Sequence, residues 1–131
     1  MLLELSISNF AIIEQLQIAF SPGLNVITGE TGAGKSILLA ALGLLCGQRV
    51  KSGAARNPEK PIWVEALFSP GTDPKLGEAL INLGLEKPEE EFLIRREILP
   101  TGRNRVSLNG HLLRVGDLQT LSAYLVNVHS Q

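Results

Sequence analysis

The chain has 131 residues, of which 44% are hydrophobic and 19% charged, and its formal net charge is -1 at pH 7. This length fits one modest hydrophobic core, and the composition excludes a disordered or fibrous chain. The small net charge excludes bulk electrostatic attraction as the basis for binding nucleic acid or membrane, although a local basic patch would not show in that sum.

The first 28 residues are expected to form three strands. Apolar and polar residues alternate over 3–8 and again over 16–20, which is the period of a strand with one buried face. Residues 24–28 form a short apolar run that ends at Gly29, as in a strand buried on both faces. The pattern predicts an α/β fold in which antiparallel edge strands lead into a mixed sheet.

The pattern after this point predicts helices and strands in turn. Helices are expected from Lys35 to about Leu45, where Gly47 is a stop signal, and over 74–83. A polar loop is expected over 48–61. Strands are expected over 62–68, 92–99 and 105–108, with a hairpin turn at Asn109-Gly110. Asp117 is in place to cap a short helix that ends at Tyr124, and 125–128 is expected to form a last strand.

Residues 29–36, GETGAGKS, match the phosphate-loop pattern G-x-x-x-x-G-K-[ST] between an expected buried strand and an expected helix. Backbone N–H groups of such a loop and the amino terminus of its helix surround phosphate oxygens. Lys35 would then contact the β and γ phosphates of a bound nucleotide, and the Ser36 hydroxyl would hold Mg²⁺. The candidate nucleotide-binding residues are Gly29, Glu30, Thr31, Gly32, Ala33, Gly34, Lys35, Ser36 and Ile37.

The other parts of a triphosphate-cleaving site are not evident in the sequence. A carboxylate at the end of an apolar strand normally positions Mg²⁺. Of the two aspartates, Asp73 lies in a turn and Asp117 follows a glycine, so neither ends such a strand. Glu65 ends the stretch IWVE, where alternation favours a solvent-facing strand glutamate. Arg103 and Arg105 could form the lid of a small-molecule kinase or belong to a solvated hairpin.

Several stretches of the sequence follow one another in a recognisable order: an NF pair after a strand, an F-x-x-G-L-N turn, GETGAGKS, LGLLCGQR, and GRNRVSLNG leading to LVNVHSQ. With these features, nearly the whole sequence resembles the amino-terminal head segment of the RecN family, bacterial DNA-repair ATPases of the structural-maintenance-of-chromosomes (SMC) class and of the wider ABC type. Ser130 is a departure, since the family pattern has glycine there. The resemblance implies an ABC/SMC-type P-loop fold, with residues 1–131 as the amino-terminal lobe of a head whose signature sequence, Walker B carboxylates and coiled coil lie outside the chain.

The resemblance also implies roles and partners. Gln131 would contact Mg²⁺ and the attacking water and serve catalysis together with Lys35, and Asn9 or Phe10 would lie near the nucleotide. In the complete protein, the lobe would join the carboxy-terminal half of the same head, and ATP would bind between two such heads. DNA would be engaged by the assembled protein. ATP hydrolysis is expected of the complete protein and is expected to be negligible for the lobe alone.

The sequence favours a cytoplasmic setting, and the resemblance implies a bacterial protein that associates with the nucleoid after DNA damage. Cys46 is the single cysteine, which excludes an intrachain disulfide and favours a reducing compartment. No membrane partner is expected, because the longest apolar stretch, 37–46, is far shorter than the roughly 20 residues that cross a bilayer.

Several alternatives stay open. The chain could be a free-standing P-loop small-molecule kinase that uses Arg103 or Arg105 on its second substrate, or a non-catalytic nucleotide-sensing module. His129 could act as a general base or as a structural hydrogen-bonding residue. Arg49 could reach phosphate or DNA, or could interact with the carboxyl end of the preceding helix.

Overall fold

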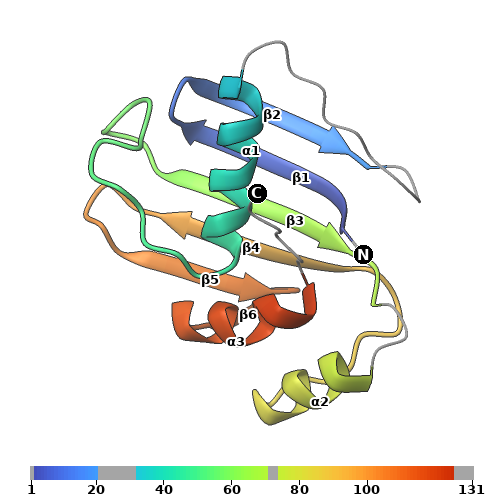
Figure 1. The fold of residues 1–131 in the computed structure, drawn as a ribbon. Coiled ribbons are helices and arrows are strands. Elements are labelled where there is room, and N and C mark those ends of the chain that lie inside the picture. Colours follow the sequence, from blue (N-terminus) through green and yellow to red (C-terminus); the bar gives the residue numbers. More distant parts are fainter. Residues whose placement is uncertain (1, 21–31, 71–73, 126–131) are drawn as a thin grey trace.

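The computed structural model describes residues 2–20, 32–70 and 74–125. Within them, six strands form one sheet in the order β2-β1-β3-β4-β5-β6, and every neighbouring pair is antiparallel (Figure 1). The strands are β1 (Leu2–Phe10), β2 (Ile13–Ala19), β3 (Ile62–Phe68), β4 (Phe92–Ile98), β5 (Asn104–Leu108) and β6 (His111–Leu113). The helices are α1 (Gly32–Leu45), α2 (Pro74–Asn82) and α3 (Val115–Leu125).

The helices pack on one face of the sheet. Alternate residues of β3, namely Val64, Ala66 and Phe68, point into a core that also takes in buried residues of all three helices. α1 crosses β3 and β4 with Leu38 and Ala41 buried, and α2 packs beside α3 (Figure 1). One core on one side of the sheet therefore sets the position of α1, the helix that follows the predicted phosphate loop.

Two features of the sheet confirm the expectations from local pattern. The remaining residues of β3, Trp63, Glu65 and Leu67, lie on the face away from the core, as the alternation predicts. The β5–β6 hairpin turns at Asn109 and Gly110, whose φ angles of 48° and 85° are the positive values that this tight turn needs. Local sequence is sufficient for both features, because each depends on neighbouring residues alone.

The first residues of two helices differ from the expectation. α1 begins at Gly32 and not at Lys35, since the N–H groups of a first turn need no partner within the helix and glycine there is tolerated. α3 begins at Val115, and Asp117 lies inside its first turn, where Oδ2 accepts a hydrogen bond from the Arg114 N–H at 2.8 Å. The predicted capping position of Asp117 is therefore wrong by one turn, although its carboxylate still satisfies a free N–H at the helix start.

The expected strands over 24–28 and 125–128 bear on whether the sheet is mixed. Residues 24–28 and 126–128 lie outside the described residues, and Leu125 is the last residue of α3. The mixed sheet therefore stays a prediction beside the antiparallel sheet that is seen. No helix in the described part of the chain is long and apolar enough to cross a membrane.

Candidate nucleotide-binding site

The amino-terminal end of α1 carries the second half of the predicted phosphate loop. Gly32, Ala33, Gly34 and Lys35 form its first turn, which contains no acidic residue, so no side chain of that turn neutralises the positive end of the helix dipole. In the following turn, Ser36 is exposed and Ile37 is half-buried. Free N–H groups and an exposed hydroxyl at a helix start fit a phosphate group accompanied by Mg²⁺. Gly29, Glu30 and Thr31 lie outside the described residues.

The carboxyl end of α1 is closed by its own backbone. Gly47 has φ of +88°, the Gln48 N–H donates to the Gly43 carbonyl at 3.0 Å, and the Gly47 N–H donates to the Leu44 carbonyl at 3.1 Å. This pair of bonds is the Schellman motif that glycine permits after a helix. The predicted stop at Gly47 is confirmed.

A buried arginine from the sheet holds the same end of α1. Arg96 on β4 is only 3% exposed, and its Nη1 donates to the carbonyl oxygens of Leu44 at 2.7 Å and Gln48 at 2.6 Å. Its Nε donates to Oδ1 of Asn104 on β5 at 2.9 Å. Burial lowers the pKa of the Arg96 guanidinium, which stays protonated because the ordinary pKa of arginine lies far above neutral pH. A cation thus meets the negative end of the helix dipole.

α3 also lies against this end of α1. Gln119 Nε2 donates to the Gly47 carbonyl at 3.1 Å. A Cβ added at Gly47 would lie 2.5 Å from Cγ of Gln119 and 3.0 Å from the Val115 carbonyl oxygen, so a side chain does not fit there. Glycine at this position therefore serves both the turn and the close approach of α3.

Asn9 and Phe10, which the resemblance puts near the nucleotide, have structural roles in the part of the chain that the structure describes. Asn9 Nδ2 donates to the carbonyls of Asn57 and Lys60, each at 2.9 Å, and Asn9 Oδ1 accepts from the Asn57 N–H at 2.7 Å. Phe10 is buried in the core. The Asn9 side chain therefore fastens the loop over 48–61 to the end of β1, and its donors are occupied.

Glu65, whose sequence context comes nearest to that of a magnesium-binding carboxylate, lies on the sheet face away from α1. Its carboxylate pairs with Arg95, whose guanidinium also stacks over Trp63 at 5.0 Å and lies 3.3 Å from Oε2 of Glu97. Arg105 is largely exposed and lies 3.9 Å from Oε1 of the same Glu97. Glu65 is therefore a strand glutamate in a surface ion-pair network, and the described residues contain no group of acidic, histidine or cysteine side chains placed to hold a metal.

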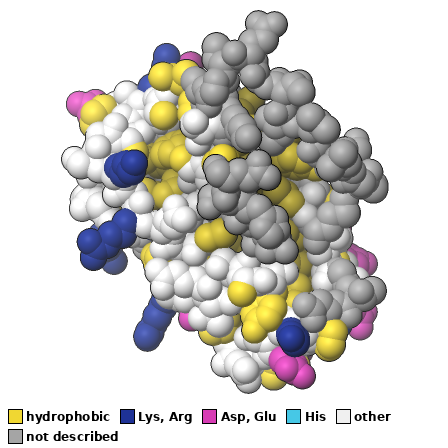
Figure 2. All heavy atoms as spheres, viewed as in Figure 1, with side chains coloured by type: hydrophobic (Ala, Val, Ile, Leu, Met, Phe, Trp, Pro, Cys, Tyr) yellow, Lys and Arg dark blue, Asp and Glu magenta, His cyan; other side chains and the backbone are white. Residues whose placement is uncertain are grey.

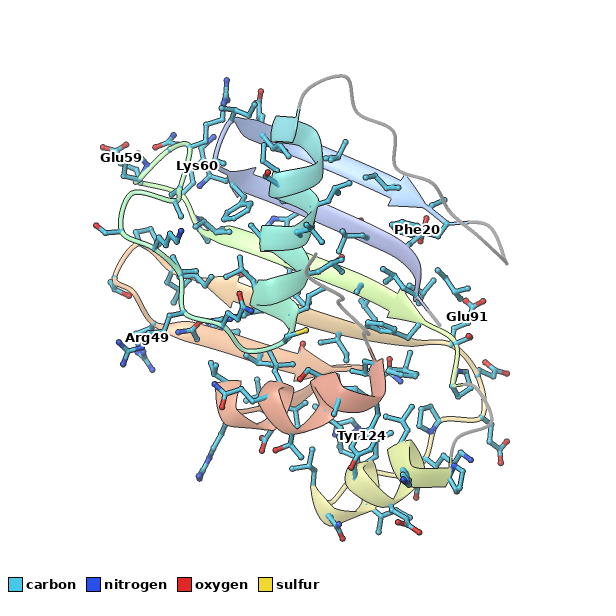
Figure 3. All side chains as sticks on the ribbon, in the orientation of Figure 1. Phe20, Arg49, Glu59, Lys60, Glu91 and Tyr124 are labelled. Carbon is cyan, nitrogen blue, oxygen red and sulfur yellow. The ribbon has the colours of Figure 1, made fainter. Side chains whose placement is uncertain are left out.

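Basic residues gather in the loop over 48–61, here called the basic loop. Arg49, Lys51, Arg56 and Lys60 are all exposed there, and Glu59 is its one acidic residue. Figure 3 shows Arg49 and Lys60 on the same edge of the molecule, with Glu91 on the opposite side. Dark blue side chains also follow one edge of the face in Figure 2. A local basic surface thus exists despite the net charge of -1.

Gln131 and His129 lie outside the described residues, as does Ser130, so their predicted places beside the nucleotide stay predictions. Arg103 is exposed in the β4–β5 turn. The sequence did not predict the hydrogen bonds of Arg96 and Gln119 at the end of α1, or the close approach of α3 to Gly47. One signal could have revealed Arg96: it is a charged residue at an inward-facing position of the strand FLIRREI.

Comparison with known proteins agrees with this geometry. The model of the AAA domain family matches residues 4–115. The chain is 42% identical over 136 residues to the DNA repair protein RecN of Halalkalibacterium halodurans and 41% identical over 132 residues to RecN of Bacillus subtilis. Each match covers 100% of this chain and 23% of the relative, so the chain spans about a quarter of the length of these relatives.

Solved structures show the same fold. An SMC ATPase structure, from work on ATP-driven dimerization and DNA-stimulated activation, has a TM-score of 0.65 and 21% identity, covering 93% of this chain and 77% of that one. The recombination mediator protein RecF with ATPrS has a TM-score of 0.68 and 25% identity, covering 90% of this chain and 29% of that one. The predicted fold class, an α/β P-loop head of the ABC/SMC type, is confirmed.

Proposed function

The chain belongs to the AAA domain family, and we propose that it forms the amino-terminal lobe of the ATP-binding head of a RecN-like DNA-repair ATPase. One observation carries this proposal: the sequence GETGAGKS runs into a helix whose first turn has no acidic residue and whose Ser36 is exposed, on a fold of the SMC head type. An anionic phosphate chain is the ligand that such a helix start favours.

The residues of the loop have separate roles in this proposal. Backbone N–H groups over 29–37 surround the phosphates, Lys35 adds a charge-assisted hydrogen bond, and the Ser36 hydroxyl is a ligand for Mg²⁺. Bound Mg²⁺ neutralises the negative charge that develops on the phosphates. Gln131 orients the attacking water beside the metal. The carboxylates that complete hydrolysis come from outside residues 1–131, so the lobe alone binds ATP weakly and turns it over negligibly.

The complete protein is proposed to work as a pair of heads in the bacterial cytoplasm, on the nucleoid after DNA damage. Each lobe joins the carboxy-terminal half of its own head, and ATP binds between two heads. ATP favours the closed pair because it has more contacts there than in the open one. The basic loop supports an encounter with DNA by the assembled protein, since Lys and Arg neutralise phosphate charge.

The small-molecule kinase is not favoured, because Arg105 lies beside Glu97 on the sheet face away from α1. A lid arginine has to reach the phosphates at the amino end of α1. The described residues include nothing that favours a nucleotide-sensing module over an ATPase head.

The test is a titration of the complete protein with a fluorescent ATP analogue, comparing Lys35→Ala with wild type. We expect loss of a charge-assisted contact to weaken binding by about tenfold or more and to abolish ATPase activity. Lys87→Ala is the matched control, because Lys87 is an exposed lysine outside the proposed site. Wild-type binding and turnover by Lys35→Ala would reject the phosphate-loop assignment.

A further inference from the structure

Arg96 occupies a position where the strand pattern calls for an apolar side chain. It lies between Ile94 and Ile98 among the inward-facing residues of β4, and within the described residues no carboxylate pairs with it. Burying an arginine without a carboxylate is costly unless polar groups surround it, and a well-packed apolar residue often gives equal or greater stability. Stability alone is therefore a weak reason for this residue.

The partners of Arg96 indicate what it does. Two of its three hydrogen bonds end on carbonyls at and just beyond the carboxyl end of α1, those of Leu44 and Gln48, and the third ends on Asn104 of β5. The Leu44 carbonyl also accepts from the Gly47 N–H, and its second lone pair is free for the guanidinium, which there faces the negative end of the helix dipole. Since Asn104 pairs with Ile98 in the β4–β5 ladder, the guanidinium ties α1 to two strands of the sheet.

The hydrogen bonds of Arg96 to Leu44, Gln48 and Asn104 are here called the clamp, and α1 connects this clamp to the predicted phosphate loop. The helix has 14 residues, so it is about 21 Å long, and its first turn contains Gly32 to Lys35. A helix moves largely as a rigid rod, and a shift at its carboxyl end is passed to its amino end. Charge-assisted phosphate contacts depend on placement to a fraction of an ångström.

We propose that Arg96 is a positioning residue of the nucleotide site, which holds α1 in the place that lets the phosphate loop bind ATP. The inference rests on the ATP-binding function proposed above. Arg96 does not contact the nucleotide, because it lies at the opposite end of α1. Arg96 sets the position of the phosphate loop relative to the sheet. Because the sheet is part of the head, it thereby sets the position of the loop relative to the rest of the head.

The experiment measures ATP binding by the complete protein, with Arg96→Met, Arg96→Lys and Asn104→Ala, at a temperature where circular dichroism shows each variant folded. We expect Arg96→Met to weaken ATP binding by about tenfold, since loop placement is lost while the side-chain volume is kept. Arg96→Lys keeps the charge but not the planar fork, so its binding should fall between wild type and Arg96→Met. Asn104→Ala should weaken binding by about threefold, because one of the three bonds is lost.

Two controls separate positioning from general stability. Arg95→Met changes the neighbouring arginine, which faces away from α1, and should leave the Kd for ATP within about twofold. Leu80→Ala creates a cavity in α2 and should lower the unfolding temperature without changing ATP binding. Equal weakening by Leu80→Ala, or wild-type ATP affinity in folded Arg96→Met and Asn104→Ala, would overturn the inference.

Lys35→Ala in the same series distinguishes the two proposals. If Lys35→Ala loses ATP while the Arg96 and Asn104 variants bind normally, the positioning role fails and the ATP site stands. If Lys35→Ala binds ATP like wild type, the proposed function itself fails.

Discussion

Gly47 is the point where α1 ends against α3, and replacing it with alanine is expected to destabilise the chain by about 2–4 kcal/mol. An alanine at φ of +88° costs about 1–2 kcal/mol by itself. The new Cβ would lie 2.5 Å from Cγ of Gln119 and 3.0 Å from the Val115 carbonyl oxygen, so α3 has to move. That movement also breaks the 3.1 Å hydrogen bond from Gln119 to the Gly47 carbonyl, which adds about 1 kcal/mol.

Gly53→Ala is the matched control, because Gly53 has a similar φ of +79° and nothing within 4 Å of an added Cβ. It should lose only the conformational part, about 1–2 kcal/mol. The assay is urea unfolding of the chain followed by circular dichroism, with the free energy of unfolding compared between the two variants. Equal losses for Gly47→Ala and Gly53→Ala would refute the close packing of α3 on the end of α1.

Asn9→Ala should destabilise the chain by about 2–3 kcal/mol, because it removes several partly buried hydrogen bonds to the basic loop, and limited proteolysis should then cut within 48–61. Unchanged stability and an uncut loop would show that this side chain does not hold the loop. Glu65→Gln should cost less than about 1 kcal/mol in urea unfolding, since its ion pair with the partly exposed Arg95 is screened by solvent; a loss of several kcal/mol would contradict a surface role. Burial raises the pKa of the Cys46 thiol, so iodoacetamide should alkylate the folded chain more slowly than the urea-unfolded chain at pH 8. The same raised pKa means that the contribution of Cys46 to stability is complete below the pKa of the unfolded thiol and declines as the pH rises above it, so a stability that increased there would conflict with this assignment.

Local sequence was sufficient for the parts of the fold that depend on neighbouring residues. The two faces of β3, the turn at Asn109-Gly110 and the stop at Gly47 follow from alternation and from the backbone freedom of single residues. The phosphate-loop assignment also depends on neighbouring residues alone, because the motif is a contiguous stretch of sequence.

The clamp at the end of α1 and the fastening of the basic loop could not be predicted in this way. Arg96 bonds to residues 48 and 52 positions away along the chain, and Asn9 bonds to residues 48 and 51 positions away. No local pattern specifies which distant carbonyl a buried polar side chain will reach. The inward-facing position of Arg96 indicates that its guanidinium needs hydrogen-bond partners, but it does not identify them.

An experimental structure of the complete protein with a non-hydrolysable ATP analogue and Mg²⁺ would show whether the amino end of α1 binds the phosphates of ATP. We expect phosphate oxygens within about 3 Å of backbone N–H groups over 32–36, with Lys35 on the terminal phosphates and the Ser36 hydroxyl on the metal. A nucleotide bound elsewhere, with the amino end of α1 facing only solvent, would show that α1 is not the phosphate-binding helix.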